Sequence, residues 1–297
     1  MLLAITGAAG FVGRAVVRHI EAQQPGVDLL LADRELAGFD AHETLEGDLS
    51  DPAIIAALTA PRIDAVLHLA ALPGGATERE PATSRAINLG VPLALIEAMR
   101  GRRLVIAGSI AVFGGALPDQ MDDATVPTPA SVYGTHKRMV ELAFADAVRR
   151  GAVSGLALRL PGIVARPAAA GGFGSAFLSD IFHSALAGTP LRVPVAADAT
   201  SWLMSVRCCA TNLIVAALGE RTAQDAVTLP ALRVTIGDLV AELARHGDVS
   251  GIRFEEIPAT RAMFGSYPDL ATPRADTLGF RHDVSLAELV EAVLADL

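Results

Sequence analysis

The feature that most constrains this chain is a glycine-rich stretch near its amino end. The apolar run Leu2–Thr6 has the length of a β-strand, and three glycines at intervals of three residues follow it before apolar residues resume at helical spacing. This order predicts a strand, a tight turn and a helix. A phosphate can approach such a turn only where side chains are absent, and the unpaired N–H groups at a helix start attract negative charge. The residues expected to bind a diphosphate are Gly7, Gly10, Phe11, Val12 and Gly13.

An acidic residue at the end of the next apolar run extends this prediction to a dinucleotide. The run 27–32 ends at Asp33, where a carboxylate can bind both ribose hydroxyls of an adenosine. Glycine triplets also serve helix packing, and it is the combination with Asp33 that favours the dinucleotide. Because Asp33 repels the additional phosphate of NADP, we expect the cofactor to be NAD.

Further strands are predicted to end at the same edge of the sheet. A brief strand at 44–49 places Asp48 and Leu49 near an adenine ring, although Asp48 equally suits the loop before the helix start at 50–52. The run 63–71 reads as a buried strand whose end passes under the pyrophosphate and ribose. The residues expected at that end are Leu69, Ala70 and Ala71. A helix over 82–99 then carries Asn88, which we expect to anchor the interior of the site.

Strands alternate with helices through Leu160, which predicts an α/β fold with a Rossmann-type doubly wound parallel sheet. We expect residues 1–165 to form the NAD-binding domain, with later segments adding back to the sheet. Residues 166–297 contain shorter segments and are expected to form mainly a small C-terminal α/β substrate-binding cap. A length of 297 residues with 52% hydrophobic content is sufficient for both.

Composition and charge exclude several classes of function. A net charge of −9 without a dense basic block argues against nucleic acid as a partner. Uninterrupted apolar runs of about 18 residues are absent from the sequence, so no membrane partner is expected. The amino end has no basic residues before its apolar core, which favours the cytoplasm over secretion. The seven histidines and the adjacent Cys208 and Cys209 have no metal-ligand spacing, so we expect no metal.

The catalytic candidates are Ser109, Tyr133 and Lys137. Strand 103–109 brings Ser109 to the edge of the sheet that carries the glycine turn, and a spacing of four places Tyr133 and Lys137 on one helical face. A free phenol has a pKa of about 10, which is too high for a base at neutral pH. A lysine ammonium about 4 Å away is worth about 4 kcal/mol at an effective dielectric near 20, or about 3 pKa units.

With this help Tyr133 can remove the proton of a substrate hydroxyl that Ser109 holds, with Ile110 beside it, while a hydride passes to the nicotinamide. Without Ser109 and the glycine turn, Tyr-x-x-x-Lys would be read as an ordinary helix face. His136 is expected to be a solvated neighbour and is not included in the site.

These residues resemble the extended short-chain dehydrogenase/reductase family, also known as the NAD-dependent epimerase/dehydratase family. The stretches 109–119, 158–167, 202–203 and 227–230 are similar to its D-erythronate 2-dehydrogenase branch. The resemblance covers nearly the whole chain and implies NAD-dependent oxidation of a small, D-erythronate-like sugar acid at C2 to the 2-keto acid. It also implies the catalytic set Ser109, Tyr133 and Lys137, and Pro161 at the cofactor.

Other interpretations remain open. The chain is alternatively a nucleotide-sugar epimerase or dehydratase with tightly held NAD, a uronate dehydrogenase, or a non-catalytic protein that senses NAD on the same fold. A sugar-acid substrate needs a partner for its carboxylate, and Arg166 and Arg207 are the candidates, with a structural ion pair as the alternative for each. The helices near Asn88 and Tyr133 are expected to pair in a homodimer.

Overall fold

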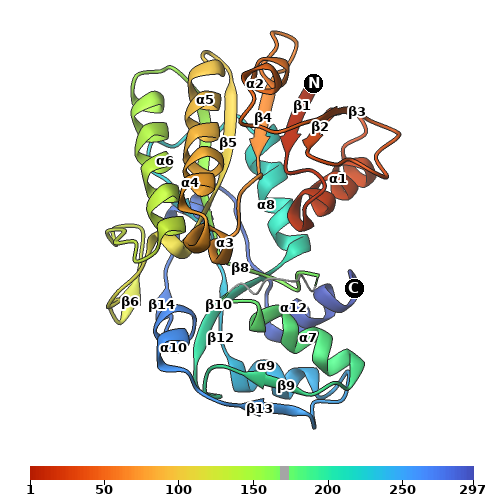
Figure 1. The fold of residues 1–297 in the computed structure, drawn as a ribbon, viewed down its shortest axis with the longest axis vertical. Helices are drawn as coiled ribbons and strands as arrows, with labels where there is room; N and C mark the ends of the chain where they lie inside the picture. The colour runs from red at the N-terminus through yellow and green to blue at the C-terminus, as the bar shows by residue number, and fades with distance from the viewer. Residues whose placement is uncertain (168–173) are drawn as a thin grey trace. The chain divides into compact units, whose positions relative to one another are not determined.

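The computed structural model describes residues 1–167 and 174–297, and its contacts divide the chain into two compact units (Figure 1). The first comprises residues 1–112, 129–160 and 210–228; the second comprises residues 113–128, 161–209 and 229–297. Both units therefore combine segments that are distant in the sequence. From the sequence we expect one boundary, at residue 165, between two domains, which is a simpler division than these two units of three segments each. The predicted domain boundary stays a prediction.

The first unit is built on a parallel sheet with the strand order β11-β7-β5-β4-β1-β2-β3. Neighbouring strands of this sheet pair in parallel, and the chain proceeds outward in both directions from β1. The predicted doubly wound α/β fold is confirmed, with a topological switch beside β1 where such sheets bind ligands. The strands are β1 Leu2–Thr6, β2 Asp28–Asp33, β3 Glu43–Glu46, β4 Ala65–His68, β5 Arg103–Ser109, β7 Ser154–Leu160 and β11 Val227–Thr228.

This sheet is buried on both faces, which explains why its strands are apolar runs rather than alternating patterns. On one face Ala4, Val66 and Leu104 pack in a common core with Leu95 of α5 and Phe144 of α6. Figure 1 shows α5 and α6 side by side in this unit. The strand residues of the opposite face, Leu3, Ile5, Leu67 and Val105, are fully buried as well.

The helices of the first unit begin with the signals that the sequence carries. Asp51 caps α2 through its carboxylate, and Ser131 caps α6 by accepting a hydrogen bond from the Gly134 N–H group. A π-helical turn, η1, joins α4 to α5 without interrupting the helical backbone. The helices are α1 Phe11–Gln23, α2 Pro52–Leu58, α3 Gly74–Arg79, α4 Pro81–Ser84, η1 Arg85–Gly90, α5 Val91–Ala98, the 3₁₀ turn η2 Ile110–Val112 and α6 Val132–Arg149. Helix α8, Val206–Leu218, belongs to this unit from Ala210 onward.

The second unit has a sheet of its own, in which β10 pairs antiparallel with β12 and parallel with β8. Its core combines Phe182 of α7, Leu203 of β10, Leu239 of α9 and Leu289 of α12. The strands are β6 Gln120–Met121, β8 Gly162–Val164, β9 Leu191–Val193, β10 Thr200–Ser205, β12 Leu232–Thr235, β13 Ile252–Phe254 and β14 Asp269–Leu270. The helices are α7 Phe177–Ala187, α9 Ile236–Leu243, α10 Pro258–Phe264, α11 Pro273–Thr277 and α12 Leu286–Leu294.

Among residues 1–167 and 174–297, no helix is both long enough and apolar enough to cross a membrane. Within the same part of the chain, no three His, Cys, Asp or Glu side chains are grouped so that they could hold a metal ion.

Candidate active site

The turn between β1 and α1 depends on its glycines. Gly7 has a positive φ of 72°, and a Cβ atom there would lie 2.7 Å from the backbone nitrogen of Ala70. A Cβ atom on Gly13 would lie 2.1 Å from the carbonyl oxygen of Gly7. Side chains are thus excluded at both positions, and the backbone curls tightly in front of α1. Gly10, the N-cap residue of α1, has no side chain to occupy the first N–H groups of the helix, which suits a diphosphate.

Asp33 lies at the end of β2 and is tied to this turn. Its Oδ2 atom accepts a hydrogen bond of 3.0 Å from the Ala9 N–H group, and its Oδ1 atom accepts one of 2.8 Å from the Arg34 N–H group. The carboxylate is therefore held beside the glycine turn in a fixed orientation. This arrangement fits an adenosine ribose whose diphosphate lies at the start of α1.

Asp48 and Leu49 follow β3 by a short loop. The Oδ1 atom of Asp48 accepts hydrogen bonds from the N–H group of Ser50 at 2.8 Å and from its hydroxyl at 2.7 Å, which lowers the pKa of Asp48. Its side chain thus shapes the loop before α2, while Leu49 is buried. The placement of Asp48 and Leu49 beside an adenine stays a prediction. Because the Asp48 carboxylate is engaged in the loop, we expect the Asp48 backbone and the Leu49 side chain to make the contact.

The end of β4 lies directly against the glycine turn. The Leu69 N–H group donates to the carbonyl oxygen of Thr6 at 3.1 Å, and the Ala70 N–H group donates weakly to the Thr6 hydroxyl at 3.4 Å. Ala70 and Ala71 continue the chain with small side chains beside Gly7. The expected cofactor edge therefore combines two neighbouring strands, and the residues present fit a dinucleotide.

Lys137 is 4% exposed and points into the first unit. Its Nζ atom donates a 2.7 Å hydrogen bond to the carbonyl oxygen of Ala107 on β5 and lies 5.6 Å from the centre of the Tyr133 ring. Burial lowers the pKa of Lys137 to about 8, while the Glu141 carboxylate one turn further along α6 raises it. The lysine therefore still carries its proton for most of the time at neutral pH.

Gly134, in the first turn of α6, lets this helix start close to the turn that follows β5. A Cβ atom on Gly134 would lie 2.0 Å from the carbonyl oxygen of Ala111, so only glycine lets α6 pack this closely. Ser109 ends β5, and its Oγ atom accepts a hydrogen bond of 3.1 Å from the Ala111 N–H group. Gly134 is not among the residues predicted from the sequence, although a glycine inside Tyr-x-x-x-Lys, where it is a poor helix former, was the available signal.

Asn88 lies in the π-helical turn η1 and is buried. Its Oδ1 atom accepts a 2.7 Å hydrogen bond from the Leu72 N–H group, and its Nδ2 atom donates one of 2.8 Å to the Leu72 carbonyl oxygen. The amide therefore fixes the loop that follows β4. Its expected role as an anchor of the interior of the site stays a prediction.

Two histidines of the first unit, neither of them among the predicted site residues, make hydrogen bonds with hydroxyl groups. His136, expected to be solvated, is half-buried, and its Nδ1 atom lies 2.9 Å from the Ser84 hydroxyl. His68 is fully buried, with Nδ1 at 2.7 Å from the Thr6 hydroxyl. Burial and the Lys137 charge lower the pKa of His68 to about 3, so its ring is neutral. Among the described residues, Nε2 of His68 is the buried polar atom for which no hydrogen-bond partner is found.

The remaining predicted residues lie around the ends of β5 and β7 and in the second unit. Ile110 is buried in η2, and Pro161 is buried directly after β7. Arg207 forms an ion pair of 3.2 Å with Asp296 and is 53% exposed.

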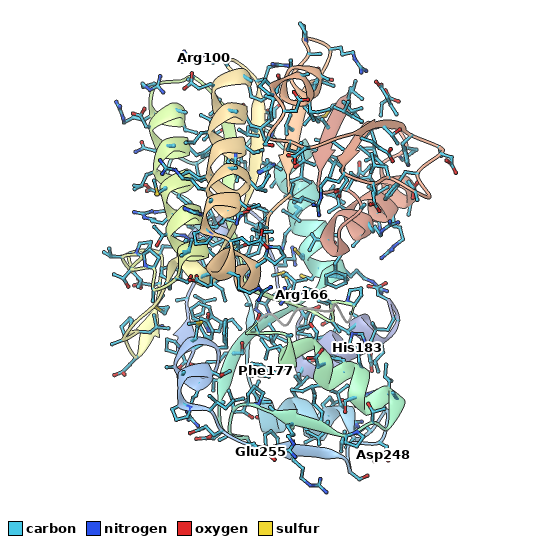
Figure 2. All side chains as sticks on the ribbon, viewed as in Figure 1. Arg100, Arg166, Phe177, His183, Asp248 and Glu255 are labelled. Atoms are coloured by element: carbon cyan, nitrogen blue, oxygen red, sulfur yellow. The ribbon has the colours of Figure 1, made fainter. Side chains whose placement is uncertain are left out.

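Arg166 is held at its backbone by α7 and at its side chain by Ser175, which precedes this helix. Its N–H group donates to Ser179 Oγ at 3.0 Å, and its carbonyl oxygen accepts from His183 Nε2 at 2.7 Å. Its guanidinium donates to Ser175 Oγ at 3.2 Å. Figure 2 labels Arg166 and His183 in this unit.

Comparisons with known proteins identify the family of the chain. The model of the NAD dependent epimerase/dehydratase family matches residues 3–203. The chain is 32% identical to a D-erythronate dehydrogenase of Cupriavidus necator, over 100% of this chain and 98% of that protein. It is 29% identical to a D-erythronate dehydrogenase of Haemophilus influenzae, over 98% of each. A solved nucleoside-diphosphate-sugar epimerase from Agrobacterium tumefaciens is 32% identical and superimposes with a TM-score of 0.88, covering 100% of this chain and 94% of that one.

Proposed function

The chain belongs to the NAD-dependent epimerase/dehydratase family and is an NAD-dependent dehydrogenase of the extended short-chain dehydrogenase/reductase type, and we propose that it oxidises a secondary hydroxyl of a small sugar acid. The proposed substrate is D-erythronate or a close relative, and the proposed position is C2, giving the 2-keto acid. The observation that carries this proposal is the full-length similarity to the D-erythronate dehydrogenase of Cupriavidus necator.

In the proposed mechanism Tyr133 is the base. The Lys137 ammonium, 5.6 Å from the centre of the Tyr133 ring, favours the phenolate over the phenol. Ser109 holds the substrate hydroxyl by a hydrogen bond and keeps its proton within reach of Tyr133. NAD, when bound, supplies the acceptor for the hydride that leaves the same carbon. The hydroxyl oxygen loses its proton to Tyr133 and the carbon that carries it loses a hydride, so the secondary alcohol becomes a ketone.

The proposed cofactor contacts follow the carboxyl edge of the sheet. The glycine turn and the start of α1 take the diphosphate, and Asp33 takes the adenosine ribose. The side chain of Lys137 also reaches the nicotinamide ribose in this proposal, and Asn88 keeps the loop after β4 in place beside it.

We assign the carboxylate of the substrate to Arg166 in preference to Arg207. Arg207 already forms an ion pair with Asp296, so an incoming carboxylate has to compete for it. The Arg166 charge also acts on a carboxylate, that of Asp180. The preference for Arg166 rests on its position: Ser179 and His183 fix its backbone on both sides, and its guanidinium donates to the Ser175 hydroxyl. A fixed guanidinium can bind a carboxylate through two parallel hydrogen bonds.

Two other activities of the same family remain candidates. The similarity to the Agrobacterium nucleoside-diphosphate-sugar epimerase favours a nucleotide-sugar epimerase or dehydratase that retains its NAD. A uronate dehydrogenase would use the same base and cofactor on a larger acid.

One assay separates these candidates. Purified protein is incubated with NAD and, in turn, D-erythronate, other aldonic acids, uronic acids and nucleotide-linked sugars, while NADH formation is followed. We expect net NADH formation with D-erythronate-like acids, and deuterium placed at C2 should appear in the NADH. Epimerisation of a nucleotide sugar without net NADH would instead support the second candidate.

We also propose that the protein is a cytoplasmic homodimer whose interface includes α5 and α6. These packed helices expose Leu93, Met139 and Leu142, with 37%, 46% and 55% of their surface accessible. Replacing Met139 and Leu142 by glutamate should yield a monomer in light scattering, whereas Val284→Glu, at a position that is 80% exposed in the second unit, should not. A monomeric parent protein would contradict the proposal.

A further inference from the structure

The side chain of Asn88 makes one hydrogen bond beyond those to Leu72. After bonding both backbone groups of Leu72, its Nδ2 atom donates a second hydrogen bond, of 3.3 Å, to the hydroxyl of Ser84 one turn earlier. Both side chains are buried. The bonds to Leu72 fix which end of the amide is nitrogen, since a carbonyl oxygen can only accept and an N–H group can only donate.

This geometry leaves the Ser84 proton available for the next hydrogen bond. The Ser84 oxygen accepts from Asn88, and Nδ1 of His136 lies 2.9 Å away. The hydroxyl donates to Nδ1 when that ring nitrogen carries no proton. His136 then accepts at Nδ1 and carries its own proton on Nε2, as a neutral ring. Burial and the Arg85 charge lower the pKa of His136, while the Glu78 charge raises it, so the neutral ring predominates at pH 7.

The other end of the chain of hydrogen bonds is the backbone of Leu72, which begins the loop that leads to Gly74. This loop passes beside the proposed base, because a Cβ atom placed on Gly74 would lie 3.9 Å from Cγ of the Tyr133 ring. The loop continues into α3, which packs against α6, and the Glu78 carboxylate of α3 accepts a 2.7 Å hydrogen bond from the Val132 N–H group. The bonds to Leu72 therefore fix the start of a loop whose end is a neighbour of the Tyr133 ring.

We propose that His136 and Ser84 are positioning residues that hold the Asn88 amide, and through it the loop from Leu72 to Gly74, in the orientation that the base Tyr133 needs. This inference rests on the proposed function for the role of Tyr133, whereas the hydrogen-bond chain stands on its own distances. His136 lines an open surface pocket of about 550 Å³ together with Thr135 and Ser131.

Four variants separate positioning from general stability. His136→Phe keeps a ring but removes the acceptor, and Ser84→Ala removes the hydroxyl. His136→Asn places an amide oxygen near the former Nδ1 position and should restore the acceptor. Thr135→Val is the matched control, because Thr135 lines the same pocket without belonging to the chain of hydrogen bonds.

The first readout needs neither cofactor nor substrate. Hydrogen–deuterium exchange of the Leu72 amide, corrected for intrinsic rates, should accelerate about tenfold or more in His136→Phe and Ser84→Ala, since a lost buried hydrogen bond is worth about 1–3 kcal/mol. The exchange rate should return toward that of the parent in His136→Asn and stay unchanged in Thr135→Val.

The second readout is turnover. We expect kcat to fall about 10- to 100-fold in His136→Phe and Ser84→Ala, as for a misplaced reacting group, with the dissociation constant of NAD changed by about twofold or less. His136→Asn should recover most of the loss. If Ser84→Ala does not fold, the two His136 variants decide the question.

Three results would overturn the inference: unchanged kcat in His136→Phe, no recovery in His136→Asn, or faster Leu72 exchange without any loss of kcat. Failure of the proposed function is recognised separately. In that case Tyr133→Phe keeps its activity or no sugar acid is oxidised, while the exchange pattern at Leu72 still reports on the hydrogen-bond chain.

Discussion

Replacing Gly134 by alanine tests whether the packing of α6 determines activity. Two effects of opposite sign compete. Alanine is the better helix former by about 1 kcal/mol, which favours the variant. The added Cβ atom, however, would lie 2.0 Å from the Ala111 carbonyl oxygen, whereas an ordinary contact of this kind is at least about 3.4 Å. The start of α6 must therefore move away from the turn after β5 by more than about 1 Å.

The steric effect should prevail over the helix propensity. Overpacking of this kind costs about 1–3 kcal/mol, so we expect the free energy of unfolding to decrease by up to about 2 kcal/mol after the gain in propensity is subtracted. A displacement of about 1 Å between Tyr133 and Ser109 should lower kcat about 100-fold. The loss of activity should thus exceed what the small loss of stability explains.

Gly90→Ala is the matched control, because Gly90 is also helical but exposed. A Cβ atom there would meet only the Arg85 carbonyl oxygen, at 3.6 Å. Urea unfolding followed by circular dichroism should show Gly90→Ala equal to the parent or more stable by about 1 kcal/mol, with kcat retained. If Gly134→Ala were as stable and as active as Gly90→Ala, the argument from close packing would be refuted.

Four further predictions concern the cofactor, the base, the lysine that supports it and the substrate. Asp33→Asn should lower the ratio of kcat/KM with NAD to kcat/KM with NADP, because the carboxylate that repels the additional phosphate is lost. A parent enzyme that used NADP as well as NAD would refute the role of Asp33. Tyr133→Phe should abolish turnover while NAD affinity measured by calorimetry is kept, and retained turnover would indicate another base. Burial lowers the pKa of Lys137 to about 8, so the ammonium that supports Tyr133 loses its proton as the pH rises above 8. We therefore expect kcat/KM to decline above pH 8. A kcat/KM that keeps rising to about pH 10 would contradict this role of Lys137. Arg166→Lys should raise KM for the acid strongly without changing NAD affinity, whereas Arg207→Lys should have little effect; the reverse order would transfer the carboxylate to Arg207.

Much of the cofactor side was predictable because its signals are local. The glycine turn, the helix start at 50–52 and the strand 103–109 each depend on residues within a few positions of one another, and the structure confirms these elements. Backbone sterics act at short range, so a pattern of glycines and apolar residues suffices to predict a strand, a turn and a helix.

The helix around Asn88 is a feature that local sequence patterns did not predict correctly. The sequence predicts one helix over 82–99, but the structure inserts the π-helical turn η1 within it. The insertion accompanies the bonds that Asn88 makes with Leu72, sixteen residues earlier. Nothing in the helical periodicity of apolar residues reports such a bond, because it depends on a loop that is placed by β4.

By itself the sequence determined the parallel α/β fold, the glycine turn with Asp33, and the presence of Ser109 and Tyr-x-x-x-Lys. Tertiary structure alone decided that Gly134 packs on Ala111, that His136 bonds to Ser84, and that Arg207 pairs with Asp296. The physical reason is the separation in sequence between the residues that interact. Propensity, capping and turn chemistry act along the chain, whereas these contacts join residues more than twenty positions apart and form only when the packed elements bring them within hydrogen-bonding or van der Waals distance.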